Sequence, residues 1–420
     1  MVEEGKIIMR KIRILDISSY MIVPPTSGGA QRIVRPLTKM KDEDSVEIDL
    51  LYTAYGENAK KSQEYLEKYP CINRAVPIIP MIDLSDERAM PEGFCSEVWR
   101  TMGMEIKDMA VRMVQKKFYD VIQIEHSMMA WIVPYLKKES PESKFVLDLH
   151  NAEYRVFEKW LPYAKTEDYK NIKKQYESLY AWEMGCWKWF DAAFTVSPIE
   201  TELFQKATGC RMIYEVPTGG GIDVDEYEPK DKNRMKPYDL LYMGTMEWYP
   251  NAQGLLWFIQ NVLPHVVEKR PETKLHIVGY GKPDGELVEL ANNHPNVIFW
   301  GQQADDKWFF HGAKVFIVPL FIGAGARVKI PTAWASRVPV ASTVFGPEGI
   351  DARNGENICM TDNPMEYAEN ILRLLSDEEY HKKITDNAFD MLKENYSSNV
   401  CVEKLVKAYH EIAEINKENV

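Results

Sequence analysis

The chain has 420 residues, of which 45% are hydrophobic and 27% charged. This composition excludes disordered, collagen-like and coiled-coil chains and fits roughly two or three globular domains. The formal net charge of −12 repels a phosphate backbone and argues against a nucleic-acid-binding protein. The longest nearly apolar stretch, Ser127 to Tyr135, is shorter than the roughly 18 to 20 residues that cross a bilayer.

The N-terminal segment MVEEGKIIMRKIRIL mixes acidic and basic residues. It lacks the uncharged run of about 7 to 15 residues that is typical of a secretory signal. The six cysteines form no CxxC pair and have no histidine at zinc-site spacing: Cys71, Cys95, Cys186, Cys210, Cys359 and Cys401. We therefore expect a cytoplasmic protein with buried free thiols and at most peripheral membrane contact.

Short β-rich apolar runs alternate with helical patterns along the whole chain, which predicts an α/β fold with parallel sheets. In the first half, strands are predicted over residues 12–17, 46–52, 75–79, 121–124, 145–149, 192–196 and 213–216. Several are continuously apolar, as expected of strands covered on both faces. Between the first two, Ala30, Ile33, Val34 and Leu37 have helical spacing, and Pro36 is expected to kink or shorten that helix.

After Pro217, the segment TGGGIDVDEYEPKDKNRMKPYD has no apolar period and indicates an interdomain linker. We predict an N-terminal domain over residues 1–220, a C-terminal domain over 221–398 and a final helix over 399–420. Asp223 and Asp225 form a DxD pair, but we assign it no metal, because a linker does not bring together the oxygen ligands of a hard cation.

The second half repeats the architecture of the first, with a second series of parallel strands. Strands are predicted over residues 240–244, 274–279, 297–301, 315–320 and 338–343, and near 358–360. Ligand sites in such folds assemble at the carboxyl ends of the strands, so function is expected in a cleft between the two halves.

The segment from Val318 to Ala335 suggests an anion site. A buried strand is followed by the small-residue loop Gly323 to Ala326, and Pro331 places the start of the next helix near Arg327. Backbone N–H groups and the charges of Arg327 and Lys329 suit a diphosphate there. Cations oppose the dipole at a helix start, so they are hard to explain by stability alone. The alternative is a tight turn with two solvated bases.

Five motifs of the second half carry a resemblance: LLYMGTMEWYPNAQGLLWF, LHIVGYG, VIFWG, VPLFIGAGARVKI and PVASTVFGPEGI. In order and spacing they resemble the donor-binding half of a retaining GT-B glycosyltransferase of the large family 4 type, GxGxRxK branch. PPTSGGAQRIV and VPTGGGID resemble, more weakly, the glycine loop and the interdomain junction of its first half. The resemblance implies two Rossmann-like domains facing each other across a cleft, with the final helix packed back on the first.

The implied activity is transfer of a sugar from a nucleoside-diphosphate sugar to a carbohydrate, lipid-linked or small-molecule acceptor. No metal or other cofactor is implied. Arg327 and Lys329 match the positions that hold the diphosphate and carry catalysis. The donor-binding residues implied by the matching positions are Gly28, Gly29, Gly244, Thr245, Gly279, Gly301, Gln302, Gly323, Ala324, Gly325, Ala326 and Thr332.

The chain departs from the family pattern at Thr332, at Ala324 and over Thr245 to Asn251, where the Arg and Lys of other branches are missing. Thr332 stands where many relatives have a glutamate, and a threonine hydroxyl cannot accept hydrogen bonds from two ribose hydroxyls as a carboxylate does. Ala324 stands where some relatives have a second glutamate. Two alternatives therefore stay open: a nucleotide-sugar-binding protein with impaired catalysis, and a nucleotide-sugar epimerase of the same fold. An NAD dehydrogenase is disfavoured, because neither half has GxGxxG after its first strand.

On the acceptor side, the run DVIQIEHS ends a strand with Glu125 and His126, where the family often has a histidine or acid beside the reacting sugar. Successive side chains of a strand alternate faces, so we expect one of the two to point into the cleft and favour His126. His150 and Asn151 follow the next strand and resemble the HN pair of this branch. Capping of the following helix is an alternative role for Asn151.

Overall fold

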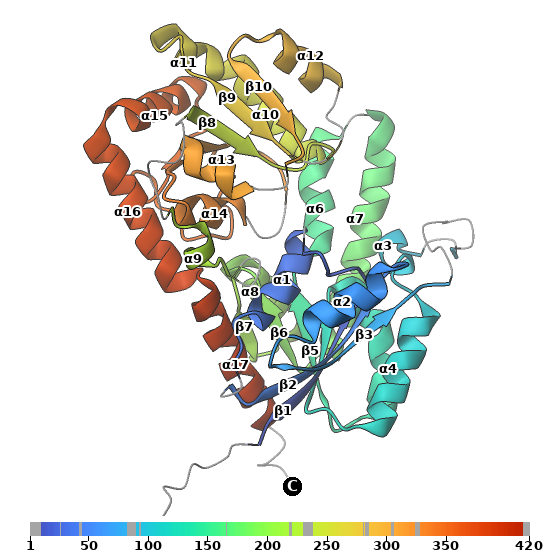
Figure 1. Cartoon of the computed structure of the whole chain (residues 1–420). Helices are drawn as coiled ribbons and strands as arrows, with labels where there is room; N and C mark the ends of the chain where they lie inside the picture. Colours follow the sequence, from blue (N-terminus) through green and yellow to red (C-terminus); the bar gives the residue numbers. More distant parts are fainter. Residues whose placement is uncertain are drawn as a thin grey trace, which may run out of the picture. The chain divides into compact units, whose positions relative to one another are not determined.

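The computed structural model in Figure 1 describes residues 10–25, 27–41, 44–81, 90–91, 94–164, 166–217, 221–229, 238–279, 281, 285–303, 306–323 and 328–414. These residues form two compact units. The first contains the chain up to Gly221 and again from Cys401 onward, and the second lies between Ile222 and Val400. Each unit contains one parallel sheet, of seven and six strands respectively, so the predicted α/β fold is confirmed.

The sheet of the first unit has the strand order β3-β2-β1-β4-β5-β6-β7. Its strands are β1 (Ile12–Ser18), β2 (Val46–Thr53), β3 (Ile72–Ile78), β4 (Val121–Glu125), β5 (Lys144–Leu149), β6 (Ala192–Thr195) and β7 (Ile213–Glu215). Each predicted strand overlaps one of them. Strand β3 begins at Ile72 rather than at Ala75, because the exposed polar residues Asn73 and Arg74 hide its start from the apolar pattern.

Helices cover both faces of this sheet (Figure 1). One face packs against α3 (Ser96–Trp99), α4 (Met104–Lys116), α5 (Val133–Glu139), α6 (Glu153–Trp160), α7 (Thr166–Cys186) and α8 (Pro198–Thr208). The other packs against α1 (Gly28–Leu37), α2 (Asn58–Leu66) and the last helix, α17 (Ser398–Glu414). The apolar stripe of α17, which includes Val402, Leu405 and Ile412, thereby lies in the core of the first unit. Helix α1 ends one residue after Pro36.

The sheet of the second unit has the order β10-β9-β8-β11-β12-β13. Its strands are β8 (Tyr238–Met243), β9 (Leu275–Val278), β10 (Val297–Gly301), β11 (Ala313–Val318), β12 (Val340–Ser342) and β13 (Cys359–Met360). Its helices are α9 (Val224–Tyr227), α10 (Tyr249–Asn261), α11 (Leu263–Lys269), α12 (Gly285–Asn293), α13 (Asp306–Gly312), α14 (Lys329–Ala335), α15 (Pro364–Ser376) and α16 (Glu378–Asn395). All six predicted strands overlap observed ones.

The linker prediction is wrong for part of its length. Ile222 and Tyr227 are buried in the core of the second unit, and Ile222 pairs with Ser397 through a β-bridge. Tyr227 belongs to the short helix α9, and a helix of a single turn is too short to show a helical period in the sequence. Asp223 precedes that helix as its N-cap residue.

The topology marks one point in each sheet where a ligand would bind. In the first, the chain leaves β1 for β2 on one side and later returns to β4 on the other. In the second, β8 lies in the same way between β9 and β11. Such switch points leave a crevice at the carboxyl ends of the strands. The site residues should therefore lie after β1 and β4, and after β8 and β11.

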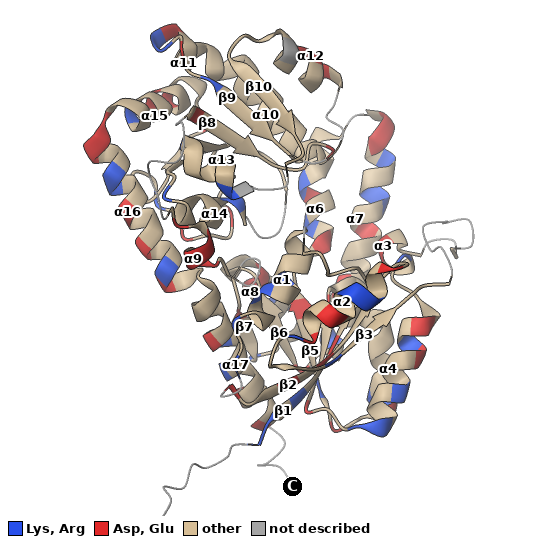
Figure 2. Cartoon of the chain, viewed as in Figure 1, with Lys and Arg blue, Asp and Glu red and all other residues tan. Residues whose placement is uncertain are grey.

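All six cysteines are free thiols, as predicted, and all are buried except Cys210, which is partly exposed. Acidic and basic side chains alternate along helices such as α7 and α16 (Figure 2), as on an ordinary solvated surface. In the part of the chain that the structure describes, no helix combines the length and the apolar character needed to span a bilayer.

Candidate active site

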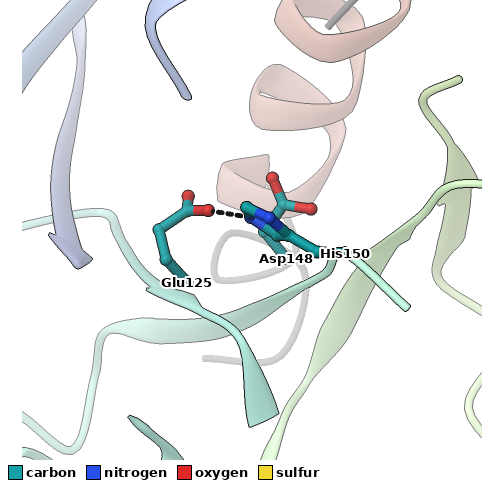
Figure 3. A group of neighbouring side chains, drawn as sticks. All are labelled: Glu125, Asp148 and His150. Carbon is teal, nitrogen blue, oxygen red and sulfur yellow. Dashed lines mark hydrogen bonds and ion pairs between the residues drawn. The ribbon is translucent and has the colours of Figure 1, made fainter. Parts of the chain in front are cut away.

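Polar side chains meet at the carboxyl ends of β1, β4 and β5, in the first unit. Glu125 ends β4 and lies opposite Asp148 of β5, and His150 follows the end of β5. His150 Nε2 lies 2.5 Å from Glu125 Oε2 (Figure 3). Arg32 of α1 donates from Nε to Asp148 Oδ1 at 2.7 Å. All four side chains are buried, so the ends of the strands hold a dry network of charges and hydrogen bonds.

Burial sets the protonation of this network. Burial raises the pKa of Glu125, and burial together with the charge of Glu125 raises the pKa of Asp16 well above its usual value. Asp16 of β1 shares a hydrogen bond with Glu125, so the protonated Asp16 carboxyl donates to the Glu125 carboxylate. Burial, followed by the nearby His126, lowers the pKa of His150 well below its usual value. His150 is therefore a neutral imidazole, with one nitrogen that donates and one that accepts a hydrogen bond.

Three of these residues could be considered as metal ligands. One atom each from Glu125, Asp148 and His150 lie within 4.8 Å of one another. However, the Arg32 guanidinium lies 2.6 Å from Asp148 Oδ1 and already supplies a positive charge there. A second cation beside it would be repelled. The arrangement favours a hydrogen-bonded network over a metal centre.

The sequence prediction at this site named Glu125 and His126, and the structure brings both of them close to His150. His126 follows β4 with φ of +69°, and its ring centroid lies 3.8 Å from that of His150. Its Nδ1 lies 3.3 Å from Glu153 Oε1. Glu125 is completely buried, whereas the His126 side chain is 15% exposed. His126 is thus the more accessible of the two.

The predicted glycine loop lies at the start of α1. Gly28 is exposed. An added Cβ at Gly29 would lie 2.6 Å from the Tyr20 hydroxyl and 3.3 Å from His150 Nδ1. A side chain at residue 29 would therefore crowd the accepting nitrogen of His150, which explains the need for glycine there.

Sequence reasoning missed Asp16, Arg32, Tyr20 and Gln123. Two of them stand out in the sequence pattern. Asp16 interrupts the otherwise apolar run of β1, and Arg32 lies among the apolar residues of the buried face of α1. A charged residue in such a position is rarely buried without a partner. Tyr20 and Gln123 carry no comparable signal.

Glu183 of α7 is a buried carboxyl that accepts hydrogen bonds from residues next to the site. It accepts hydrogen bonds from the Ser127 hydroxyl at 2.5 Å and from the backbone N–H groups of Glu153 and Tyr154 at 3.2 and 3.1 Å. Glu183 therefore satisfies donors at the start of α6, the role that the sequence left open for Asn151. Burial raises the pKa of Glu183 to about 8.

This raised pKa predicts a pH-dependent stability. The ordinary value is 4.5, so the folded chain increasingly pays for ionising Glu183 as the pH rises from about 4.5 to about 8, and stability is lost over that window. Glu183→Gln should flatten this loss, by at most about 1.4 kcal/mol per pH unit. Urea unfolding of both proteins at several pH values measures the effect. Glu177→Gln, on the exposed face of the same helix, is the matched control; equal slopes for wild type and Glu183→Gln would contradict the assignment.

Glycines end three neighbouring strands of the second sheet. Gly244 follows β8, Gly279 follows β9 and Gly301 ends β10. The Gly279 N–H donates to the Gly301 carbonyl at 3.0 Å, and an added Cβ at Gly279 would lie 1.8 Å from the Gly244 carbonyl oxygen. Backbone groups of neighbouring strands therefore approach one another closely at this edge of the sheet.

Because the Gly244 backbone lies so close to Gly279, a side chain at residue 279 is expected to destabilise the fold measurably. Gly279→Ala should lower the free energy of unfolding by about 1–3 kcal/mol, because backbone atoms cannot move away as a flexible side chain can. Thermal or urea unfolding measures the change. Gly285→Ala, where an added Cβ meets no described atom within 4 Å, should be close to neutral. Equal stability of the two variants would show that the strand ends are less tightly packed than described.

Lys329 begins α14 and lies at the end of β8. Its Nζ donates to Asn251 Oδ1 at 3.2 Å and lies 5.3 Å from the centre of the Tyr242 ring. An added Cβ at Gly244 would lie 3.2 Å from Nζ. Asn251 in turn donates to the Thr245 carbonyl at 2.9 Å. The ammonium group is thus held at the switch point of the second sheet, beside two of the predicted donor-binding residues.

Other predicted residues of this unit differ in their surroundings. The Thr332 hydroxyl is buried and donates to the Val328 carbonyl at 2.9 Å, within α14. Gln302 is exposed next to Gly301. Gly323 is buried at the end of the loop after β11. The predictions for Ala324, Gly325, Ala326 and Arg327 lie outside the described residues.

Comparison with known proteins adds to this geometry. Residues 237–377, in the second unit, match the protein family described as "Glycosyl transferases group 1". An uncharacterized 44.6 kDa protein in the cps region of Klebsiella pneumoniae is 24% identical over 404 residues, which cover 92% of this chain and 97% of the relative. An uncharacterized glycosyltransferase of Methanocaldococcus jannaschii is 23% identical over 430 residues, covering 97% of this chain and 99% of the relative.

Solved structures show the same architecture. Sucrose-phosphate synthase from Thermosynechococcus elongatus superposes with a TM-score of 0.68 at 15% identity, covering 96% of this chain and 99% of that one. Anabaena HepE in complex with UDP gives a TM-score of 0.65 at 13% identity, covering 95% and 100%. The fold is therefore GT-B, as predicted. The family match and the named relative support a glycosyltransferase, an enzyme that transfers a sugar.

Proposed function

We propose that this chain transfers a sugar from a nucleoside-diphosphate sugar to an acceptor hydroxyl, with retention of anomeric configuration and without a metal. The observation that carries the proposal is Lys329, held by Asn251 beside Gly244 at the switch point of the second sheet. This point lies within the region that matches the glycosyltransferase family.

The physical role of Lys329 follows from the charge that develops in the reaction. When the bond between sugar and diphosphate breaks, negative charge builds up on the leaving phosphate oxygens. A fixed ammonium group stabilises that charge without reorganising during the step. Arg327, as the sequence resemblance implies, would add a second positive charge and replace the metal that other diphosphate sites use.

The donor class is supported by proteins of the same fold. HepE structures contain UDP alone and UDP with glucose, and one structure of TarM contains UDP with α-GlcNAc-glycerol. We therefore propose a nucleoside-diphosphate sugar as donor, with UDP sugars as the first candidates. The acceptor is a carbohydrate, a lipid-linked sugar or a small molecule, and the reaction takes place in the cytoplasm.

The first unit would hold the acceptor at the network around His150. In the proposed front-side reaction, the leaving phosphate takes the proton of the acceptor hydroxyl, and the protein supplies positioning and charge. The neutral His150 imidazole can accept a hydrogen bond from a neighbouring hydroxyl of the acceptor and so orient the reacting one.

The proposal is tested by incubating the full chain with a panel of nucleotide sugars and candidate acceptors, with and without EDTA. Transfer predicts nucleotide release that depends on the acceptor and does not change with EDTA, and the NMR coupling constant of the product's anomeric proton reports retention. Conversion of the donor to its epimer without acceptor would instead support the epimerase alternative.

One observation favours a second candidate, a nucleotide-sugar-binding protein with impaired catalysis. The Thr332 hydroxyl is engaged by the Val328 carbonyl and stands where many relatives have a carboxylate. Binding of a nucleotide sugar without turnover, not restored by Thr332→Glu, would support this candidate over the transferase.

A further inference from the structure

The last helix is connected to His150 by a line of buried hydrogen bonds. Tyr409 of α17 donates from its hydroxyl to Gln123 Oε1 at 2.6 Å. Gln123 Nε2 donates to Glu125 Oε1 at 2.6 Å, and Glu125 Oε2 lies 2.5 Å from His150 Nε2. Tyr409, Gln123, Glu125 and His150 are each at most 6% exposed. Little water can reach the line to replace a missing partner.

From this line we infer that Tyr409 and Gln123 are positioning residues, which set the tautomer of His150 so that its Nδ1 accepts a hydrogen bond. The function of that nitrogen in sugar transfer rests on the proposed function, but the tautomer does not.

The direction of each hydrogen bond follows from the groups involved. An ionised carboxylate can only accept, so the Gln123 amide must turn its NH₂ group toward Glu125 and its carbonyl toward Tyr409. The Tyr409 hydroxyl is a donor to that carbonyl and holds the amide in this orientation. Asp16 adds a second donor to Glu125. Because the pKa of Asp16 is raised well above its usual value, we place the shared proton on Asp16, and the remaining oxygen of Glu125 accepts a hydrogen bond from His150 Nε2–H.

The other nitrogen of His150 is then left with a lone pair. Nδ1 accepts a long hydrogen bond from the Tyr20 hydroxyl at 3.5 Å, and Gly29 has no side chain to cover it. A hydroxyl group of a bound acceptor would replace Tyr20 as the donor to this nitrogen. The charged and titratable groups around the ring are Glu125, Asp148, Arg32, His126, Asp16 and Tyr20.

Removing the Tyr409 hydroxyl should change the directions of these hydrogen bonds and with them the tautomer of His150. Without its partner, the Gln123 amide can turn its NH₂ group away from Glu125, and a buried carboxylate that has lost a donor takes up a proton from solvent more readily. After the uptake of that one proton, Glu125 Oε2–H donates to Nε2, and the single proton of the His150 ring lies on Nδ1. In this state His150 could no longer accept a hydrogen bond from a substrate.

The experiment is ¹⁵N NMR of the full chain labelled at histidine, with the His150 signals assigned by their loss in His150→Gln. We expect Nε2–H in the wild type and a shift toward Nδ1–H in Tyr409→Phe. Tyr214→Phe is the matched control, because it removes a hydroxyl that donates to Glu411 Oε2 of the same helix at 2.9 Å, away from the line. Gln123→Met tests the same line should Tyr409→Phe not fold.

Steady-state kinetics give the second readout. Tyr409→Phe should lower kcat by about tenfold, the effect of losing about one hydrogen bond, and leave the KM for the donor unchanged. A wild-type Nδ1–H tautomer, or identical spectra for wild type, Tyr409→Phe and Gln123→Met, would overturn the inference. If no donor supports transfer but the tautomer still changes in Tyr409→Phe, the proposed function fails and the positioning role stands.

Discussion

Replacing Lys329 with alanine is expected to lower kcat by about 100- to 1000-fold, the usual cost of removing one fixed donor from a developing negative charge. Lys329 is the first residue of α14, and its side chain contacts Asn251 near the end of β8. Its loss should therefore weaken stabilisation of the diphosphate more than it destabilises the fold. Initial rates of acceptor-dependent nucleotide release measure the effect, and a thermal unfolding curve shows whether the variant is folded.

Lys274→Ala is the matched control for this experiment. Lys274 is in the same unit and donates to the Pro295 carbonyl at 2.7 Å, at the opposite end of β9 from Gly279. Its replacement should leave turnover unchanged. A folded Lys329→Ala protein with near-normal turnover would contradict the assignment of the diphosphate to this position.

Replacing His150 should cause the second large effect, on the acceptor side. We expect His150→Ala to lower kcat by about 100-fold or more, because the acceptor hydroxyl loses a group that orients it. Donor binding should change less than turnover, because Lys329, which is assigned to the donor's diphosphate, belongs to the second unit. Calorimetric titration with the nucleotide and steady-state kinetics with the acceptor separate the two effects.

The alanine variant also leaves Glu125 with one partner fewer inside the protein, which can cost about 1–3 kcal/mol of stability. His150→Gln, which keeps a polar side chain, is a second variant for the case that His150→Ala does not fold. His410→Ala, on α17 and bonded to the Asp44 carbonyl, should have no effect on turnover. Normal acceptor kinetics in folded His150→Ala would place the acceptor away from this network.

The sequence predicted the sheets well because their strands are buried on both faces. Strands such as β1, β4 and β5 are buried along almost their whole length and mostly apolar, and such runs are visible without knowledge of their neighbours. The start of β3 was missed because its exposed residues follow no apolar pattern. The packed part of the linker was missed because Ile222 and Tyr227 contact residues far away in the chain.

The candidate site could be predicted only in part, for the same reason. Lys329 and Gly244 belong to local motifs at strand ends, and the structure brings them together. The network of the first unit depends on partners distant in sequence: Arg32 pairs with Asp148, and Tyr409 bonds to Gln123. No local pattern reports such pairings. The sequence accordingly favoured His126, whereas the structure places His150 at the centre of the hydrogen bonds.

Glu183 shows the same limit. In the sequence it is one acidic residue of a long helix, and nothing distinguishes it from the exposed Glu177. Only the packing of α7 against Ser127 and the start of α6 buries it and turns it into a cap.

A crystal structure of the full chain with a bound nucleoside diphosphate, UDP first, would test the account most directly. We predict a diphosphate oxygen within about 3 Å of Lys329 Nζ, the distance of a charge-assisted hydrogen bond, next to Gly244. UDP bound elsewhere in either unit, with Lys329 still donating to Asn251, would contradict the account.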